Sequence, residues 1–124
     1  MRTLLDKVLT GQKEARQAGF DWPDPQSVIN KVKEELQELQ ESLAGGDEIA
    51  IIDEFGDVML AVINLSLHLE LDIETALEGA LIKFKTRYKA MQSLALRQNI
   101  DFNQLDLSQK ETLWQQAKKT LIDE

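Results

Sequence analysis

DEFGDVMLAVINLSLHL, residues 53–69, is a stretch whose apolar residues occupy nearly every side of a helix. At about 100° of rotation per residue, five of its polar residues fall along one narrow line: Asp53, Glu54, Asp57, Asn64 and His68. A helix that is hydrophobic on nearly all sides is normally buried. We therefore expect this helix to lie at the centre of the fold, with part of its apolar surface packed against a second chain. Its carboxylates should face either a partner charge or a metal ion.

The segments around this stretch also predict helices. Residues 3–18 form a short amphipathic pattern, and residues 25–44 form a longer one that begins after Asp24, a favoured N-cap, with Pro25 at the first helical position. Gly45 and Gly46 should end that helix, and Asp47 should cap the central helix, which runs to about residue 70.

The rest of the chain continues in the same way. A helix should cover residues 73–96 after Asp72, residues 97–107 should form a polar loop, and Ser108 with Glu111 should make a capping box for a last helix. No segment alternates as a strand should. The predicted fold is all-α, a four-helix-type bundle with a leading N-terminal helix.

Composition limits the classes of function. The chain of 124 residues has the size of one domain, so we expect residues 1–124 to form a single domain. A net charge of −8 disfavours nucleic acid as a partner. The chain has no Cys, its N-terminus meets polar residues too early for a signal peptide, and its most apolar run is too short and polar to span a bilayer. We expect a cytoplasmic protein with no membrane partner.

Two carboxylate pairs carry the chemistry. Glu35 with Glu38, and Glu54 with Asp57, are each three residues apart on consecutive predicted helices, so antiparallel packing would bring the pairs together. Four carboxylates at one point repel one another unless a cation neutralises them. All-oxygen ligation suits Mg²⁺, with Mn²⁺ as a substitute, and these four residues are the predicted metal ligands.

Plainer interpretations exist for several of these residues. With 22 acidic residues, a pair such as Glu35 and Glu38 alone fits a solvated helix face better. The plainer interpretation suits Glu54 and Asp57 less well. Burying an unpaired ion on an otherwise apolar helix would cost several kcal/mol of folding free energy. Asn64 could orient a ligand or a water, or it could form a hydrogen bond across a helix interface.

Two other kinds of metal chemistry are excluded by the residues present. A single His and no Cys cannot supply a hydrolytic zinc site, and the Glu-x-x-His motif of di-iron bundles does not occur.

Four segments together resemble one known family. KVKEELQEL at 31–39, residues 53–69, ALEGALIKFKTRY at 76–88 and LWQQAKK at 113–119 look like the MazG family of nucleoside triphosphate pyrophosphohydrolases, in particular its C-terminal catalytic domain in two-domain bacterial members. The likeness covers about residues 19–120. It departs from the family at Phe55, where relatives usually carry Leu or Met.

This resemblance implies a helical homodimer, with a tetramer left open, that hydrolyses a nucleoside triphosphate to the monophosphate and pyrophosphate with Mg²⁺. Glu35, Glu38, Glu54 and Asp57 match the metal ligands of the family. Lys83 and Arg87 match the basic pair that contacts the phosphates, and Trp114 and Lys118 match residues next to the nucleotide. We expect Glu38, Lys83 and Arg87 to be catalytic, and Lys83, Arg87, Trp114, Lys118 and Asn64 to bind substrate.

Taken without the resemblance, Lys83 and Arg87 fit solvated cations or counter-ions to the carboxylates, and Trp114 fits a core position. The competing class is therefore a non-catalytic dimeric helical module that serves regulation or interaction. An intermediate alternative is an enzyme of the same all-α superfamily that acts on one nucleotide, such as dCTP or dUTP.

Overall fold

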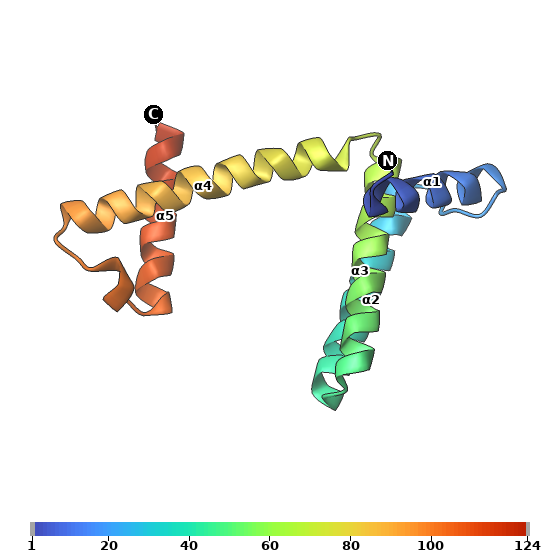
Figure 1. The fold of residues 1–124 in the computed structure, drawn as a ribbon, viewed down its shortest axis with the longest axis horizontal. Coiled ribbons are helices and arrows are strands. Elements are labelled where there is room, and N and C mark those ends of the chain that lie inside the picture. Colours follow the sequence, from blue (N-terminus) through green and yellow to red (C-terminus); the bar gives the residue numbers. More distant parts are fainter. Residues whose placement is uncertain (1, 124) are drawn as a thin grey trace. The chain divides into compact units, whose positions relative to one another are not determined.

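The computed structural model describes residues 2–123, and all of its regular structure is helical. The helices are α1 Leu4–Gln17, α2 Pro25–Gly45, α3 Glu48–His68, α4 Ile73–Arg97 and α5 Leu107–Asp123, with a 3₁₀ turn η1 at Phe102–Gln104 (Figure 1). Across residues 2–123 there is no strand, so the all-α prediction is confirmed.

The chain divides into two compact units, Met1–Ile73 and Glu74–Glu124, and each is described by itself. The first contains α1, α2 and α3, and the second contains α5 and nearly all of α4. The single domain, the four-helix bundle and its completion by dimerisation stay predictions.

An antiparallel hairpin of α2 and α3 forms the main part of the first unit (Figure 1). Asp24 caps α2 by accepting a hydrogen bond from the Ser27 backbone N–H at 2.8 Å, with Pro25 at the start of the helix as predicted. Gly46 ends α2 at φ 73°, a left-handed conformation that favours glycine. Asp47 then caps α3, so the turn places the two helices side by side.

Helix α1 packs against α3 in the same unit. It begins at a capping box in which Thr3 and Asp6 exchange hydrogen bonds between side chain and backbone. The Gln12 side chain donates a hydrogen bond to the Leu60 backbone carbonyl at 2.9 Å, which ties α1 to α3. Residues 18–24 connect α1 to α2 and lie beside the site described below.

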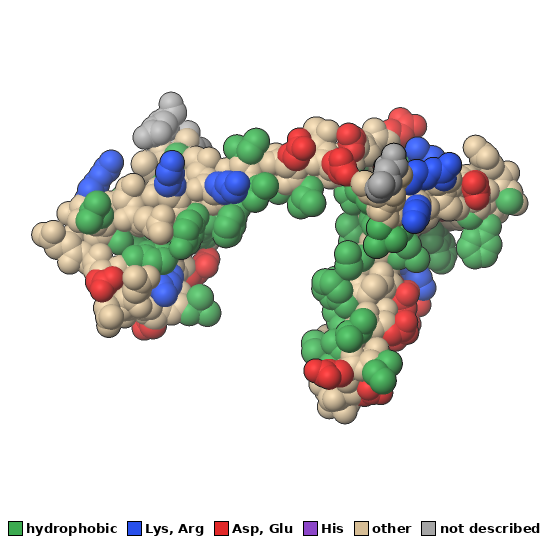
Figure 2. Space-filling view, in the orientation of Figure 1, with side chains coloured by type: hydrophobic (Ala, Val, Ile, Leu, Met, Phe, Trp, Pro, Cys, Tyr) green, Lys and Arg blue, Asp and Glu red, His purple; other side chains and the backbone are tan. Residues whose placement is uncertain are grey.

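Many apolar side chains of α3 are exposed in the single chain. Examples with more than half of the side chain exposed are Ile49, Ile52, Phe55 and Met59. Figure 2 shows hydrophobic side chains gathered along one edge of the α2–α3 hairpin. Within the first unit, α1 and α2 cover only part of the circumference of α3, so burial of α3 on nearly all sides stays a prediction.

The second unit has its own small core where α4 and α5 meet. Its buried members are Met91 and Ala95 of α4 with Leu113 and Ala117 of α5. Phe102 and Leu105 pack against this core, so the predicted polar loop at 97–107 contains a 3₁₀ turn with apolar anchors.

The start of α5 differs from the predicted capping box of Ser108 and Glu111. The Asp106 side chain accepts a hydrogen bond from the Gln109 backbone N–H at 2.8 Å, and the Gln109 side chain accepts one from the Asp106 backbone N–H at 2.9 Å. These two hydrogen bonds form a capping box that begins two residues before the predicted one. Asp106 and Gln109 can form it because they are three residues apart, as Ser108 and Glu111 are.

None of the helices that the structure describes is both long and apolar enough to cross a membrane.

Candidate functional site

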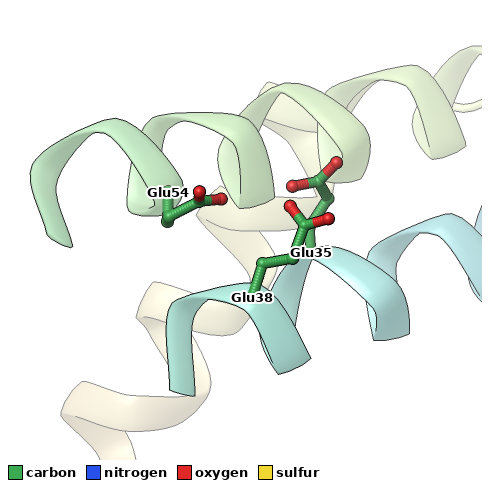
Figure 3. Close-up of side chains that lie close together, drawn as sticks. All are labelled: Glu35, Glu38 and Glu54. Carbon is green, nitrogen blue, oxygen red and sulfur yellow. The ribbon is translucent and has the colours of Figure 1, made fainter. Parts of the chain in front are cut away.

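Three carboxylates converge between α2 and α3. One oxygen each from Glu35, Glu38 and Glu54 lies within 4.8 Å of the others, a spacing that suits ligands of a single metal ion. Figure 3 shows Glu35 and Glu38 extending from α2 toward Glu54 on α3. The i, i+3 spacing puts both α2 glutamates on the side of the helix that faces its partner.

Asp57 belongs to a second group that shares Glu54 with the first. Asp53, Glu54 and Asp57 also place one oxygen each within 4.8 Å of one another, all from α3. The four predicted ligands are therefore linked through Glu54, and Asp57 is more exposed than the other three. Asp53 joins the site as a residue that was not predicted as a ligand, although its place on the polar line with Glu54 and Asp57 was a signal for it.

Two oxygens of this cluster are buried without a donor. Glu35 Oε2 and Glu54 Oε2 are shielded from solvent, and no hydrogen-bond donor of the described chain reaches them. Buried ionised carboxylates need a compensating charge or hydrogen bond. Their all-oxygen chemistry and unmet charge fit a bound metal cation.

The pKa of Glu38 reflects the repulsion between the carboxylates of the cluster. A hydrogen bond shared with the Glu35 carboxylate, together with the negative charge of Glu35 and Glu54, raises the pKa of Glu38 to about 7. Two carboxylates this close hold one proton between them more easily than two charges.

Lys31 supplies one counter-ion from within α2. Its ammonium lies 3.0 Å from Glu35 Oε1 and 3.4 Å from Glu34, and the hydrogen bond to Glu35 raises the pKa of Lys31. This single cation satisfies one oxygen of the buried Glu35 and leaves the other without a partner. The i, i+4 spacing of Lys31 and Glu35 was visible in the sequence but was not used.

A cavity of about 560 Å³ adjoins the carboxylates within the first unit. Its walls come from all three helices and from the α1–α2 connection: Gln12, Ala15, Gly19, Phe20, Asp21, Trp22, Lys31, Glu35, Asp57, Leu60, Ala61 and Asn64. Two candidate metal ligands, Glu35 and Asp57, thus also line a space of ligand size.

Asp21 connects the wall of this cavity to α3. Its carboxylate lies 3.0 Å from His68 Nε2, accepts a hydrogen bond from Asn64 Nδ2 at 3.4 Å, and pairs with Arg16 at 3.3 Å. Burial opposes ionisation of Asp21, but hydrogen bonds from His68, the Trp22 backbone N–H and Asn64 outweigh it and lower the pKa of Asp21. Sequence reasoning missed Asp21, because its partners lie more than forty positions away on α3.

Asn64 is therefore held by a residue of its own chain. The sequence left two roles open for Asn64, a contact with a ligand or water and a hydrogen bond across an interface. The structure shows such a hydrogen bond, between α3 and the α1–α2 connection. It also lines the cavity, so a contact with substrate stays a prediction.

The other predicted substrate residues lie in the second unit. Lys83 and Lys118 are exposed, while the Arg87 guanidinium stacks over the Trp114 ring at 5.7 Å from its centroid. Trp114 also packs against Phe84, with 5.8 Å between ring centroids. Trp114 therefore holds Arg87 and Phe84 in place within this unit.

The fold and the site together define the class of protein. It is an all-α protein with a carboxylate cluster suited to a divalent cation. Residues 23–92 match the MazG nucleotide pyrophosphohydrolase domain, and the chain belongs to this family.

Two curated relatives support the same assignment. The chain is 38% identical over 107 residues, or 86% of its length, to the nucleoside triphosphate pyrophosphohydrolase/pyrophosphatase MazG of Thermotoga maritima. It is 33% identical over 114 residues, or 90% of its length, to the nucleoside triphosphate pyrophosphohydrolase of Escherichia coli K12. The matches cover 41% and 43% of these relatives, so the chain spans about two fifths of their length.

Proposed function

We propose that the chain is a Mg²⁺-dependent nucleoside triphosphate pyrophosphohydrolase, which converts a nucleoside triphosphate and water to the monophosphate and pyrophosphate. The observation that carries this proposal is the convergence of Glu35, Glu38 and Glu54 within 4.8 Å beside a cavity of about 560 Å³. Family membership and the names of the two relatives support the same reaction.

The proposed metal ligands are Glu35, Glu38, Glu54 and Asp57. A bound Mg²⁺ would neutralise phosphate charge and activate a water for attack on the α-phosphorus. Glu35 and Glu54 present buried oxygens without donors, which supports the proposal, and Glu38 and Asp57 would complete an all-oxygen set from the two facing helices. The other proposed catalytic groups are Lys83 and Arg87, which would contact the phosphates and stabilise the leaving pyrophosphate.

Further binding residues are proposed from the resemblance. Trp114 and Lys118 would lie next to the nucleotide, and Asn64 would contact it from the cavity wall. The Arg87–Trp114 stacking supports a joint role for these two residues, because it limits the positions that the guanidinium can take.

We also propose a homodimer built on the exposed apolar side chains of α3. Large contiguous apolar surface is uncommon on proteins that remain monomeric. Ile49 and Ile52 are 80% and 72% exposed in the single chain, and a second copy of α3 would cover them. The single domain of residues 1–124, the cytoplasmic location and the absence of a nucleic-acid partner stay predictions.

The proposed reaction is tested by measuring pyrophosphate release from a panel of ribo- and deoxynucleoside triphosphates with Mg²⁺. We expect pyrophosphate and monophosphate in equal amounts from at least one of them, and no release when the metal is removed by a chelator. No release from any triphosphate would contradict the proposal.

A further inference from the structure

The two carboxylate oxygens of Glu35 have different surroundings. Its Oε1 lies 3.0 Å from the ammonium of Lys31, which stands one turn earlier on α2. Its Oε2 is buried, and no donor of the described chain reaches it. The Glu35 side chain is 9% exposed, so it has little freedom to turn toward solvent. One oxygen of this proposed metal ligand is thus paired with a cation of the chain, and the other is not.

Lys31 is held beside Glu35 from two sides. Its ammonium also lies 3.4 Å from Oε1 of Glu34, a residue whose side chain is 58% exposed. Both acidic partners come from the same helix, at spacings of three and four residues, so the α2 backbone fixes where the ammonium lies. Groups that form hydrogen bonds to metal ligands orient those ligands and tune the site. Lys31 is therefore placed to act on a bound metal ion through Glu35.

The paired oxygen restricts how Glu35 can bind a metal ion. A carboxylate that binds through both of its oxygens brings the ion against each of them. At Glu35 this would bring a divalent ion beside the Lys31 ammonium, where the two positive charges repel each other. Binding through Oε2 alone avoids this contact and gives the buried oxygen the opposite charge that it lacks. Glu35 should therefore supply one ligand oxygen.

Divalent cations differ in how well they accept this restriction. Mg²⁺ is small, requires a nearly ideal octahedron and keeps several waters, so it needs few carboxylate oxygens. Ca²⁺ is larger, takes about six to eight oxygen ligands and often binds both oxygens of one carboxylate. The loss of one carboxylate oxygen should therefore weaken Ca²⁺ binding more than Mg²⁺ binding.

We propose that Lys31 is a positioning residue that shifts the selectivity of the carboxylate site toward Mg²⁺ and away from Ca²⁺, by limiting Glu35 to one ligand oxygen. The inference rests on the proposed function, because it concerns the metal ion that the proposed reaction uses. Lys31 acts on both ions through its charge as well. Since the two ions carry the same charge, that effect is common to them, and the ratio of their affinities reports the selection.

The test measures metal binding in the absence of substrate. Electron paramagnetic resonance counts free Mn²⁺, and competition with bound Mn²⁺ gives Kd for Mg²⁺ and Kd for Ca²⁺ in each protein. In Lys31→Met the ratio of Kd for Mg²⁺ to Kd for Ca²⁺ should rise about 10-fold above the wild-type ratio, because Ca²⁺ gains an oxygen of Glu35 and Mg²⁺ does not.

Further variants identify the cause of this change. Lys31→Arg keeps a cation beside Glu35 and should keep the wild-type ratio. Lys33→Met is the matched control, because it removes the same charge from an exposed position two residues further along α2, and it should also keep the ratio. The Lys31 side chain is 30% exposed, so its replacement should be tolerated. Lys31→Ala repeats the comparison should Lys31→Met fail to fold, and circular dichroism checks the helices of every variant.

The outcomes separate this inference from the proposed reaction. An unchanged ratio in Lys31→Met, or an equal change in Lys33→Met, would overturn the role of Lys31. Absence of Mn²⁺ binding to the wild-type protein would overturn the metal site and both proposals with it. Selective metal binding that depends on Lys31, without pyrophosphate release from any triphosphate, would contradict the reaction and support the role of Lys31.

Discussion

Glu35 of α2 and Glu54 of α3 each bury a carboxylate oxygen that no donor of the described chain reaches, and they lie within ligand distance of one another and of Glu38. Such an arrangement is unfavourable without a cation, because it combines desolvation with like-charge repulsion. The hairpin of α2 and α3 thus holds together three carboxylates that repel one another when ionised. A site of this kind gains stability when a divalent ion binds.

Removal of one carboxylate should stop catalysis without unfolding the protein. Glu38→Gln or Asp57→Asn should lower kcat by about 100-fold or more, because each removes a proposed ligand charge while keeping the side-chain shape. The rate of pyrophosphate release measures the effect. Glu41→Gln, on an exposed position of the same helix as Glu38, should retain the wild-type rate. Wild-type turnover in both Glu38→Gln and Asp57→Asn would remove these residues from the site.

Mg²⁺ should stabilise the folded protein. Binding to the native state alone adds about 2.7 kcal/mol at a concentration 100 times Kd. We expect Tm to rise with Mg²⁺ in a thermal melt at constant ionic strength, and we expect little rise in Glu54→Gln. A non-catalytic module whose carboxylates are satisfied by ion pairs would show the same Tm with and without Mg²⁺.

Asp21 should contribute to acid sensitivity. Its pKa is lowered in the fold, so the folded state binds fewer protons than the unfolded state near the ordinary pKa of 3.8. Its contribution is therefore present above that value and is lost as pH falls through the lowered pKa. Chemical unfolding of wild type and Asp21→Asn at about pH 7 and about pH 3 measures it.

Asp21→Asn should cost about 1–3 kcal/mol of unfolding free energy at neutral pH, because it weakens contacts to Arg16 and His68. The difference between the two proteins should shrink at the lower pH. A constant difference across the pH range would show that the charge of Asp21 contributes nothing.

The apolar side chains of α3 should hold the proposed dimer together. Ile52→Glu introduces a charge at a side chain that is 72% exposed in the single chain. If a second copy covers this position, the charge would be buried and the dimer should dissociate. Light scattering should then give the mass of one chain. Leu4→Glu on α1 is the control, and a wild-type protein that is itself monomeric would contradict the dimer.

The helices were predictable because their signals are local. Asp24, Pro25 and Asp47 act within a few residues of the helix starts that they mark, and the two carboxylate pairs follow from i, i+3 spacing. The predicted capping box of α5 was wrong by two residues. Ser108 with Glu111 and Asp106 with Gln109 have the same spacing, so the spacing alone does not choose between them. Hydrogen bonding to the backbone, which the sequence does not show, selects the second pair.

The cavity could not be predicted in this way. Gln12 meets Leu60, and Asp21 meets Asn64 and His68, through contacts that form only when α1 and its connection to α2 pack on α3. None of these residues belongs to a periodic pattern that would single it out. Glu35, Glu38, Glu54 and Asp57 could be proposed from the sequence because they repeat a spacing, whereas the contacts of Asp21 and Gln12 form only in the folded structure.

Hydrolysis in ¹⁸O-labelled water tests the central claim most directly. If the carboxylate site directs water to the α-phosphorus, the label enters the nucleoside monophosphate and the pyrophosphate stays unlabelled. Mass spectrometry of both products, with Mg²⁺ present and the most active triphosphate as substrate, should show this pattern. Label in the pyrophosphate, or release of inorganic phosphate with a nucleoside diphosphate, would contradict the account.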